Sequence, residues 1–154
     1  MIQRIQSIWF FLAGLLGALS LFPTLARFAK DGGAYAMTAI GYQTLNLPPD
    51  ASLPIMPWGV TLFSVVLCVL PLWTLFLYRN RRLQLRLAAW NVAAVIAWYA
   101  TWVAYAVSFA GRMQTEFTPA FAAVLPFLSL VFVMLARRGV QKDEELVRAA
   151  DRIR

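Results

Sequence analysis

Long hydrophobic runs alternate with short polar segments along this chain. Four runs, at residues 5–26, 58–78, 87–111 and 117–136, contain no Asp, Glu, Lys, Arg or His, and each has 20 or more residues. About 20 apolar residues in a helix cross the hydrocarbon core of a bilayer. The runs must be helical because lipid offers no hydrogen-bond partners to the backbone. The pattern predicts an all-α membrane protein in which residues 1–136 form a four-transmembrane-helix bundle.

The first run also has features of a cleaved signal peptide. Arg4 precedes its apolar core, and Ala26 closes a stretch that fits a cleavage site. We expect the run to be retained as the first span, with cleavage as the alternative.

Basic residues are distributed unevenly over the polar segments. Eleven of the fourteen lie before the first run, between the second and third runs, or after the fourth. The other three are Arg27, Lys30 and Arg112. Segments rich in Lys and Arg resist translocation, so we expect both termini to lie in the cytoplasm.

The longest outer connection covers residues 27–57. Its stretch 34–42 is rich in strand-favouring residues, and turn residues stand at Gly32–Gly33 and Pro48–Pro49. A short β-hairpin that caps the outer face and a disordered loop both fit this composition. The connection 80–86 is short, which makes the second and third runs an antiparallel pair.

The chain becomes polar after residue 136. Apolar residues recur there at near-helical spacing, and Glu144 precedes Arg148 by one helical turn. We expect residues 137–154 to form a cytoplasmic amphipathic helix. It would lie on anionic lipid, fold against the basic 80–86 connection or hold a partner, and a solvated tail with no specific role is the simplest alternative.

Composition agrees with a bilayer environment. The chain is 61% hydrophobic and 14% charged, with a mean hydropathy of +0.66, which leaves too little charged surface for a water-soluble domain. The net charge is +7, and the basic residues flank the apolar runs. This placement is typical of residues that set membrane topology and does not indicate a nucleic-acid partner.

Candidate chemistry is sparse. Cys68 is the single cysteine and there is no histidine, so the chain has no disulfide framework, no His-ligated metal or haem and no His-based acid–base pair. A four-span enzyme that generates disulfides is excluded for the same reason. We expect no catalytic residues, metal ligands or cofactor. The absence of charge inside the runs argues against ion-coupled or proton-coupled transport.

Small residues are spaced for close helix packing in the first and third runs. The set is Ala13, Gly14, Gly17, Ala18, Ala93, Ala97 and Thr101. Such ridges let helix backbones approach in lipid. They serve packing within the monomer, a homo-oligomer or a partner interface.

Trp90, Trp98 and Trp102 share a second face of the third run. Trp90 suits an interfacial anchor, whereas the deeper indoles need hydrogen-bond partners. Core packing is the simpler role for this face. The alternative is a groove near Pro71 for a quinone or lipid.

Three blocks resemble a known family. They are Met1-Ile-Gln-Arg-Ile-Gln-Ser7, Arg79-Asn-Arg-Arg-Leu-Gln-Leu-Arg86 and Lys142-Asp-Glu-Glu-Leu-Val-Arg-Ala-Ala-Asp-Arg-Ile-Arg154. They are similar to the domain of unknown function 4293 family, small four-span membrane proteins of Bacteroidota. The resemblance implies a bacterial inner-membrane location and carries no activity or cofactor.

The functional hypothesis follows from these absences and from the charged cytoplasmic face. We expect a non-catalytic structural or accessory subunit of an inner-membrane complex, bound to a membrane-protein partner or to copies of itself. The docking residues would be Arg79, Arg81, Arg82, Arg86, Asp143, Glu144 and Asp151, with tail carboxylates paired to the basic connection. The alternative is binding or transport of a lipid or quinone between the spans.

Overall fold

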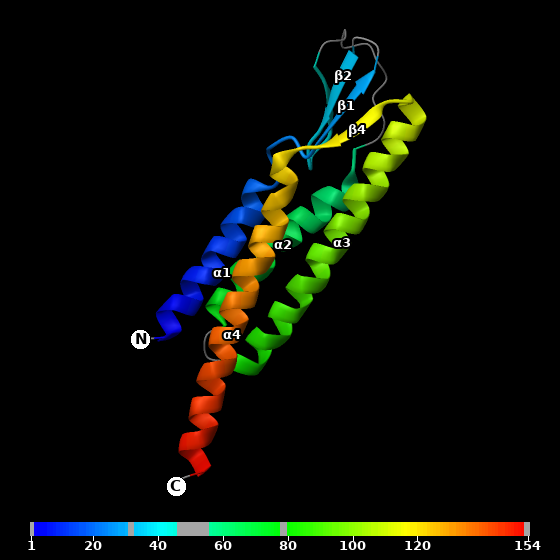
Figure 1. Ribbon diagram of the computed structural model, residues 1–154. Coiled ribbons are helices and arrows are strands. Elements are labelled where there is room, and N and C mark those ends of the chain that lie inside the picture. The colour runs from blue at the N-terminus through cyan, green and yellow to red at the C-terminus, as the bar shows by residue number, and fades with distance from the viewer. Residues whose placement is uncertain (1, 31–32, 46–55, 78–79, 153–154) are drawn as a thin grey trace.

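Four helices lie side by side and a small antiparallel sheet covers one end of them (Figure 1). The computed structural model describes the chain apart from residues 1, 31–32, 46–55, 78–79 and 153–154, and apart from the side chains of residues 2–4, 30, 148 and 150–152. The helices are α1 (Ile2–Leu19), α2 (Trp58–Phe76), α3 (Arg81–Met113) and α4 (Leu125–Arg152), with a 3₁₀ turn, η1 (Phe121–Val124), before α4.

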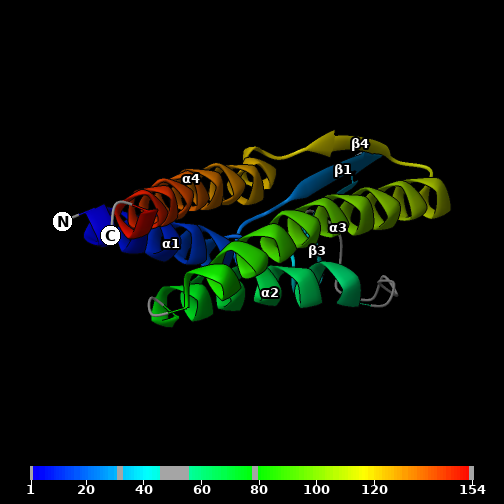
Figure 2. The same cartoon turned by 90° about the horizontal axis from the view of Figure 1, so that it is seen from below.

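The helices form a ring in chain order. Helix α1 packs against α2 and α4, and α3 packs against the same two helices from the other side (Figure 2). Successive helices run in opposite directions, so both ends of the chain lie at one end of the ring and the sheet at the other (Figure 1). We name these the termini end and the sheet end.

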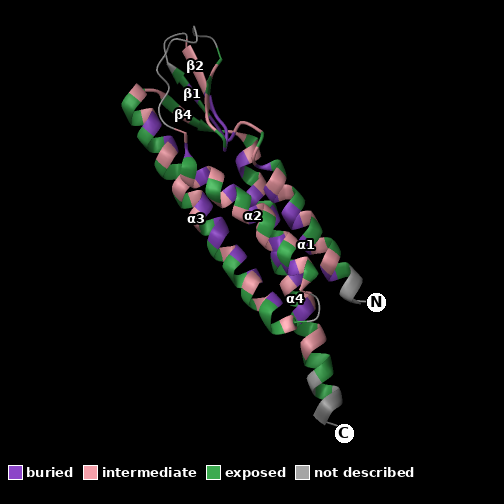
Figure 3. Ribbon diagram, turned by 180° about the vertical axis from the view of Figure 1, so that it is seen from behind, coloured by how far each residue is buried: buried purple, intermediate pink, exposed green. Residues whose placement is uncertain are grey.

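Three helices are long and apolar enough to cross a membrane. They are Trp58–Phe76, Arg81–Met113 and Phe121–Val147, and at most a third of the residues in their apolar windows are buried. Figure 3 shows the exposed positions along the outward faces of the helices. Large apolar side chains such as Leu62, Trp73 and Phe76 are among them. An outward apolar surface of this extent indicates a membrane protein.

Helix α1 is shorter than predicted. Its described apolar part, Ile5–Leu19, is shorter than the other three apolar helices. The sequence pattern predicted a span that continues to residue 26. The helix ends where the Ser20 hydroxyl bonds the carbonyl of Gly17 at 2.7 Å and Pro23 follows, which cannot continue a helix. The chain then enters a strand at Ala26.

The third and fourth helices also differ from the sequence boundaries. Helix α3 begins at Arg81, because the side chain of Asn80 caps it by accepting the N–H of Leu83 at 3.3 Å. Of the basic residues predicted in a loop, Arg81, Arg82 and Arg86 therefore occupy the first turns of α3. The tail predicted as a separate helix is the continuation of α4, which has no break at residue 136.

The hairpin alternative for the outer connection is confirmed, and the sheet is larger than a hairpin. Its strands are β1 (Ala26–Lys30), β2 (Gly33–Met37), β3 (Tyr42–Thr44) and β4 (Glu116–Pro119), in the order β3-β2-β1-β4 with antiparallel neighbours. Strand β4 lies in the connection between α3 and α4. The prediction that a helix begins at residue 117 is therefore wrong, because that segment pairs with β1.

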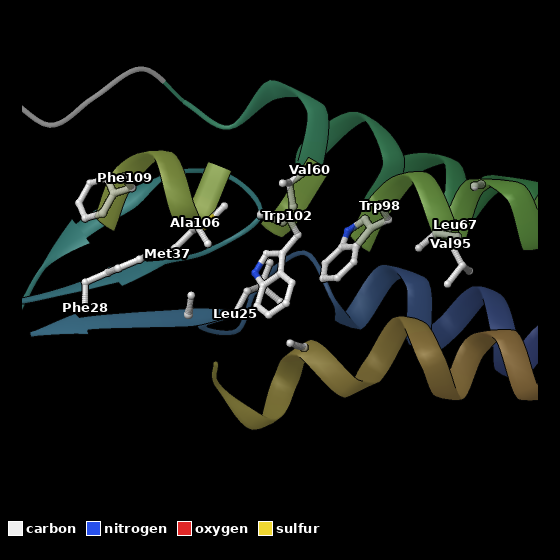
Figure 4. Close-up of a cluster of buried hydrophobic side chains, with 14 residues drawn as sticks. Leu25, Phe28, Met37, Val60, Leu67, Val95, Trp98, Trp102, Ala106 and Phe109 are labelled. Atoms are coloured by element: carbon white, nitrogen blue, oxygen red, sulfur yellow. The ribbon is translucent and has the colours of Figure 1, made fainter. Parts of the chain in front are cut away.

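The main core joins the sheet to the helices. Phe28 of β1 pairs with Tyr35 and Phe117 on neighbouring strands, and its ring lies 4.6 Å from that of Phe109 on α3 (Figure 4). The hydroxyl of Thr61 on α2 donates to the carbonyl of Ala39. The sheet is thus fixed to both α2 and α3, while Phe10, Ala13, Val133 and Val140 form part of a second core toward the termini end.

Candidate functional site

Two of the predicted docking residues meet at the termini end. The Nη1 atom of Arg81 donates to the main-chain carbonyl of Asp143 at 3.2 Å. The carboxylate of Asp143 accepts a hydrogen bond of 2.6 Å from the Nε2 atom of Gln6. Asp143 therefore connects α4 to α3 through its backbone and to α1 through its side chain.

This geometry differs from the predicted pairing of carboxylates with guanidinium groups. The Asp143 carboxylate is bound by an uncharged amide that the sequence did not single out. Gln6 is 6% exposed, and a buried amide requires a partner. Gly139 gives Gln6 its room, because a Cβ atom at that position would lie 2.9 Å from the Gln6 Cγ atom.

The structure describes three of the remaining predicted docking residues. Arg82 and Arg86 are exposed on α3, and Glu144 is half-buried on α4. Arg79 and the side chain of Asp151 lie outside the described residues. The hydrogen bond from Arg81 to the main-chain carbonyl of Asp143 is thus the contact described between the basic segment and the tail.

Beyond Asp143, α4 extends past the ends of the other helices (Figure 1). Leu146 and Val147 are 55% and 46% exposed on this extension. Their neighbour Glu145 is exposed as well. An apolar pair is therefore presented on a helix that the Gln6 and Arg81 contacts hold against the bundle.

The small residues of α1 lie in close helix contacts. A Cβ atom at Gly17 would be 2.5 Å from the carbonyl oxygen of Leu67 on α2, and one at Gly14 would be 2.7 Å from Leu72. On the other side of α1, the carbonyl of Ala13 accepts a hydrogen bond of 2.9 Å from the hydroxyl of Ser129 on α4. Ala18, the fourth small residue of this set, is half-buried.

The small residues of α3 have two environments. Thr101 packs against Gly59 on α2, because a Cβ atom added to Gly59 would lie 3.3 Å from the Cγ2 atom of Thr101. Ala93 and Ala97 instead line an apolar groove of about 440 Å³ between α2 and α3. Its other lining residues are Phe63, Val66, Leu70, Trp90 and Ala94.

Trp98 and Trp102 take the simpler of the two roles expected from the sequence, core packing, and they are not among the residues that line the α2–α3 groove. Their rings are stacked 5.9 Å apart and are 0% and 7% exposed (Figure 4). The indole nitrogen of Trp98 donates to the hydroxyl of Ser64 at 2.7 Å. Pro71 is buried too. These two tryptophans are core because they turn toward α2 and the sheet, whereas Trp90 is exposed and lines the α2–α3 groove.

A second hollow lies at the sheet end, between β3, the start of α2 and the last turns of α3. It is a cavity of about 290 Å³ lined by polar and aromatic residues. They include Tyr42, Trp58, Tyr105, Ser108 and Arg112. Sequence reasoning missed this cavity, although it had placed Arg112 among the few outer basic residues.

Tyr42 is the most perturbed titratable group of the cavity. Burial, with a smaller contribution from neighbouring Tyr105, raises its pKa to about 12, and the charge of Arg112 acts in the opposite direction. The Tyr42 ring is stacked on Phe109 with centroids 4.5 Å apart. The phenol is therefore protonated at neutral pH and available as a hydrogen-bond donor.

Among the residues that the structure describes, no three His, Cys, Asp or Glu side chains are placed to hold a metal ion. In comparisons with known proteins, the family model described as Domain of unknown function (DUF4293) matches residues 2–153. No curated protein matches the chain.

Proposed function

Since the chain belongs to the DUF4293 family of domains of unknown function, we propose from its own geometry that it is a non-catalytic accessory subunit of a bacterial inner-membrane protein complex. It would dock through its cytoplasmic face. The partner would be another membrane protein, which binds at the α4 extension.

In this proposal α1 is the first of four spans and both termini are cytoplasmic. Packing of α1 against α2 and α4 supports a position alongside the longer helices. Basic residues are concentrated at the termini end, including Arg82, Arg86 and Arg138. The positive-inside rule then assigns that end to the cytoplasm and the sheet to the opposite side.

The observation that carries the docking proposal is the exposed apolar pair Leu146 and Val147 on an anchored helix. Hydrophobic side chains on a helix held in fixed orientation suit insertion into a partner's groove. Arg82 and Arg86 lie on the first turns of α3, the segment that Arg81 joins to Asp143. We therefore expect a partner segment with an apolar stripe bordered by acidic residues.

Gentle detergent extraction of the native protein tests the proposal. Wild-type protein should elute with a companion at fixed stoichiometry, and the double variant Leu146→Ser/Val147→Ser should lose it. Ala149→Ser changes an exposed residue of the same extension and should keep the companion. A wild-type protein that elutes alone, or a double variant that keeps its companion, contradicts this proposal.

A second candidate function is binding of a hydrophobic molecule, a lipid or a quinone, and the α2–α3 groove favours it. Ala93 and Ala97 leave space that Phe63 and Leu70 enclose on the opposite helix. Ala93→Phe should fill this space and lower the amount of lipid or quinone retained after extraction, as counted by native mass spectrometry. Ala104→Phe, at an exposed position of α3 outside the groove lining, is its control.

A further inference from the structure

We propose that the cavity at the sheet end binds the phosphate headgroup of an anionic lipid from the outer leaflet. The site is separate from the α4 extension. This proposal extends the second candidate function, binding of a hydrophobic molecule. Only the placement of the acyl chain depends on that function.

The polar groups of the cavity form a set of hydrogen-bond donors. Arg112 contributes a guanidinium group, Tyr42 and Tyr105 contribute phenols, and Ser108 contributes a hydroxyl. Within the described part of the chain, the hydroxyls of Tyr42 and Tyr105 have no hydrogen-bond partner in the protein. A guanidinium group beside unpartnered donors suits a phosphate, which accepts several charge-assisted hydrogen bonds.

The acidic residue nearest along the chain faces away from the cavity. Glu116 of β4 pairs with Ala29, whereas the next pair, Phe28 and Phe117, belongs to the core beneath the sheet. Because successive side chains of a strand point to opposite faces, Glu116 lies on the far face of the sheet. Among the described residues that line the cavity, Arg112 carries a charge, and this charge favours an anion.

The position of the cavity along α3 matches a lipid headgroup. Trp58 begins α2 and Tyr105 packs against Gly59, so both aromatic rings lie at one level, as in an interfacial belt. Arg112 and Ala97 are fifteen residues apart on α3, a rise of about 22 Å. This distance is about half of a bilayer of roughly 40–45 Å, headgroups included.

The apolar groove lies below the cavity on the same seam. On α3, Ala97, Thr101, Tyr105, Ser108 and Arg112 follow at steps of three or four residues, which places them on one helix face. The groove lining on α2 continues the same face from Gly59 through Phe63, Val66 and Leu70. Because Gly59 is in close contact with Thr101 and Tyr105, the acyl chain of a headgroup held at Arg112 would run over the outward surface of α2 and α3 toward the groove at Ala97.

Binding of phosphatidylglycerol to the purified full chain in detergent, followed by native mass spectrometry, tests the site. Arg112→Gln should raise the apparent Kd about tenfold or more, since it removes a charge-assisted contact. Arg27→Gln removes the same charge from an exposed position on β1 and should leave the Kd unchanged. Equal effects of the two substitutions would overturn the proposal.

Inorganic phosphate distinguishes a lipid site from a free-anion site. Millimolar phosphate should fail to displace phosphatidylglycerol, because the acyl chain adds binding surface that free phosphate lacks. Complete displacement would overturn the lipid assignment. If Arg112→Gln does not give a folded monomer, the double variant Tyr42→Phe/Tyr105→Phe retains both rings and should weaken binding several-fold, and an unchanged Kd would overturn the proposal.

These outcomes are independent of the docking proposal. The double variant Leu146→Ser/Val147→Ser should bind phosphatidylglycerol as the wild type does. Loss of the companion protein and loss of the lipid can therefore be told apart.

Discussion

Gln6 and Asp143 are 137 positions apart in the sequence, and a hydrogen bond of 2.6 Å joins the amide of one to the carboxylate of the other. The contact closes the ring of helices between α1 and α4 at the termini end. It also fixes the direction in which α4 leaves the bundle.

Gln6→Leu should destabilise the protein by about 1–2 kcal/mol, because the half-buried Asp143 carboxylate loses a donor that Leu cannot replace. The midpoint of thermal unfolding in detergent measures the loss. Gln141→Leu alters an exposed position of α4 and should change stability by less than about 0.5 kcal/mol. Equal midpoints of thermal unfolding for the two variants would show that the hydrogen bond between Gln6 and Asp143 is not made.

Gly17→Ala should cost about 1–3 kcal/mol, because its methyl group would lie 2.5 Å from the main-chain oxygen of Leu67 and the helices would have to separate. Gly111→Ala is the matched control, since nothing lies within 4 Å of a Cβ atom there. That substitution should be neutral or stabilise α3 by up to about 1 kcal/mol. Unfolding by a denaturing detergent compares the two, and the reverse ranking is incompatible with the packing of α1 on α2.

Ser64→Ala should cost about 1–3 kcal/mol because it leaves the buried indole N–H of Trp98 without an acceptor. Trp98→Phe removes the donor, so Ser64→Ala should cost much less in that background. A double-mutant cycle on unfolding free energies isolates the bond. If the changes in unfolding free energy caused by the two substitutions simply add, the hydrogen bond is ruled out.

The proposed topology predicts which positions an impermeant maleimide reaches. In a Cys68→Ser background, cysteine at the exposed position Gln43 of β3 should react in intact spheroplasts. Cysteine at the exposed position Glu145 of α4 should react only after the membrane is opened. The opposite order of labelling would place the termini outside the cytoplasm.

Tyr42 should make the protein sensitive to alkali. Its pKa is raised from 10.0 to about 12 in the folded state. The protonated phenol therefore makes its full contribution to the free energy of unfolding below pH 10. Between pH 10 and about 12 the unfolded chain loses this proton first, and stability falls as pH rises. Tyr42→Phe keeps the ring on Phe109 and should show a shallower decline, measured by thermal unfolding across this range.

Part of the candidate site could be predicted from the sequence. Charge patterning placed Arg81 and Asp143 on the same face, and the structure brings them into contact. Gln6 gave no signal, because an uncharged amide next to an apolar run acquires its role only from a partner far along the chain. The cavity at Arg112 was missed for a similar reason, since its lining comes from β3, α2 and α3.

By itself, the sequence determined that long apolar helices form and that the stretch 34–42 favours strands. These properties depend on local length and side-chain type, which lipid and backbone geometry constrain directly. Only the tertiary structure decided that Glu116–Pro119 joins the sheet as its edge strand, that Ser64 accepts the hydrogen bond of the Trp98 indole and that α4 continues unbroken into the tail. Those outcomes depend on which surfaces meet, and strand pairing and burial are energies of contact between distant segments.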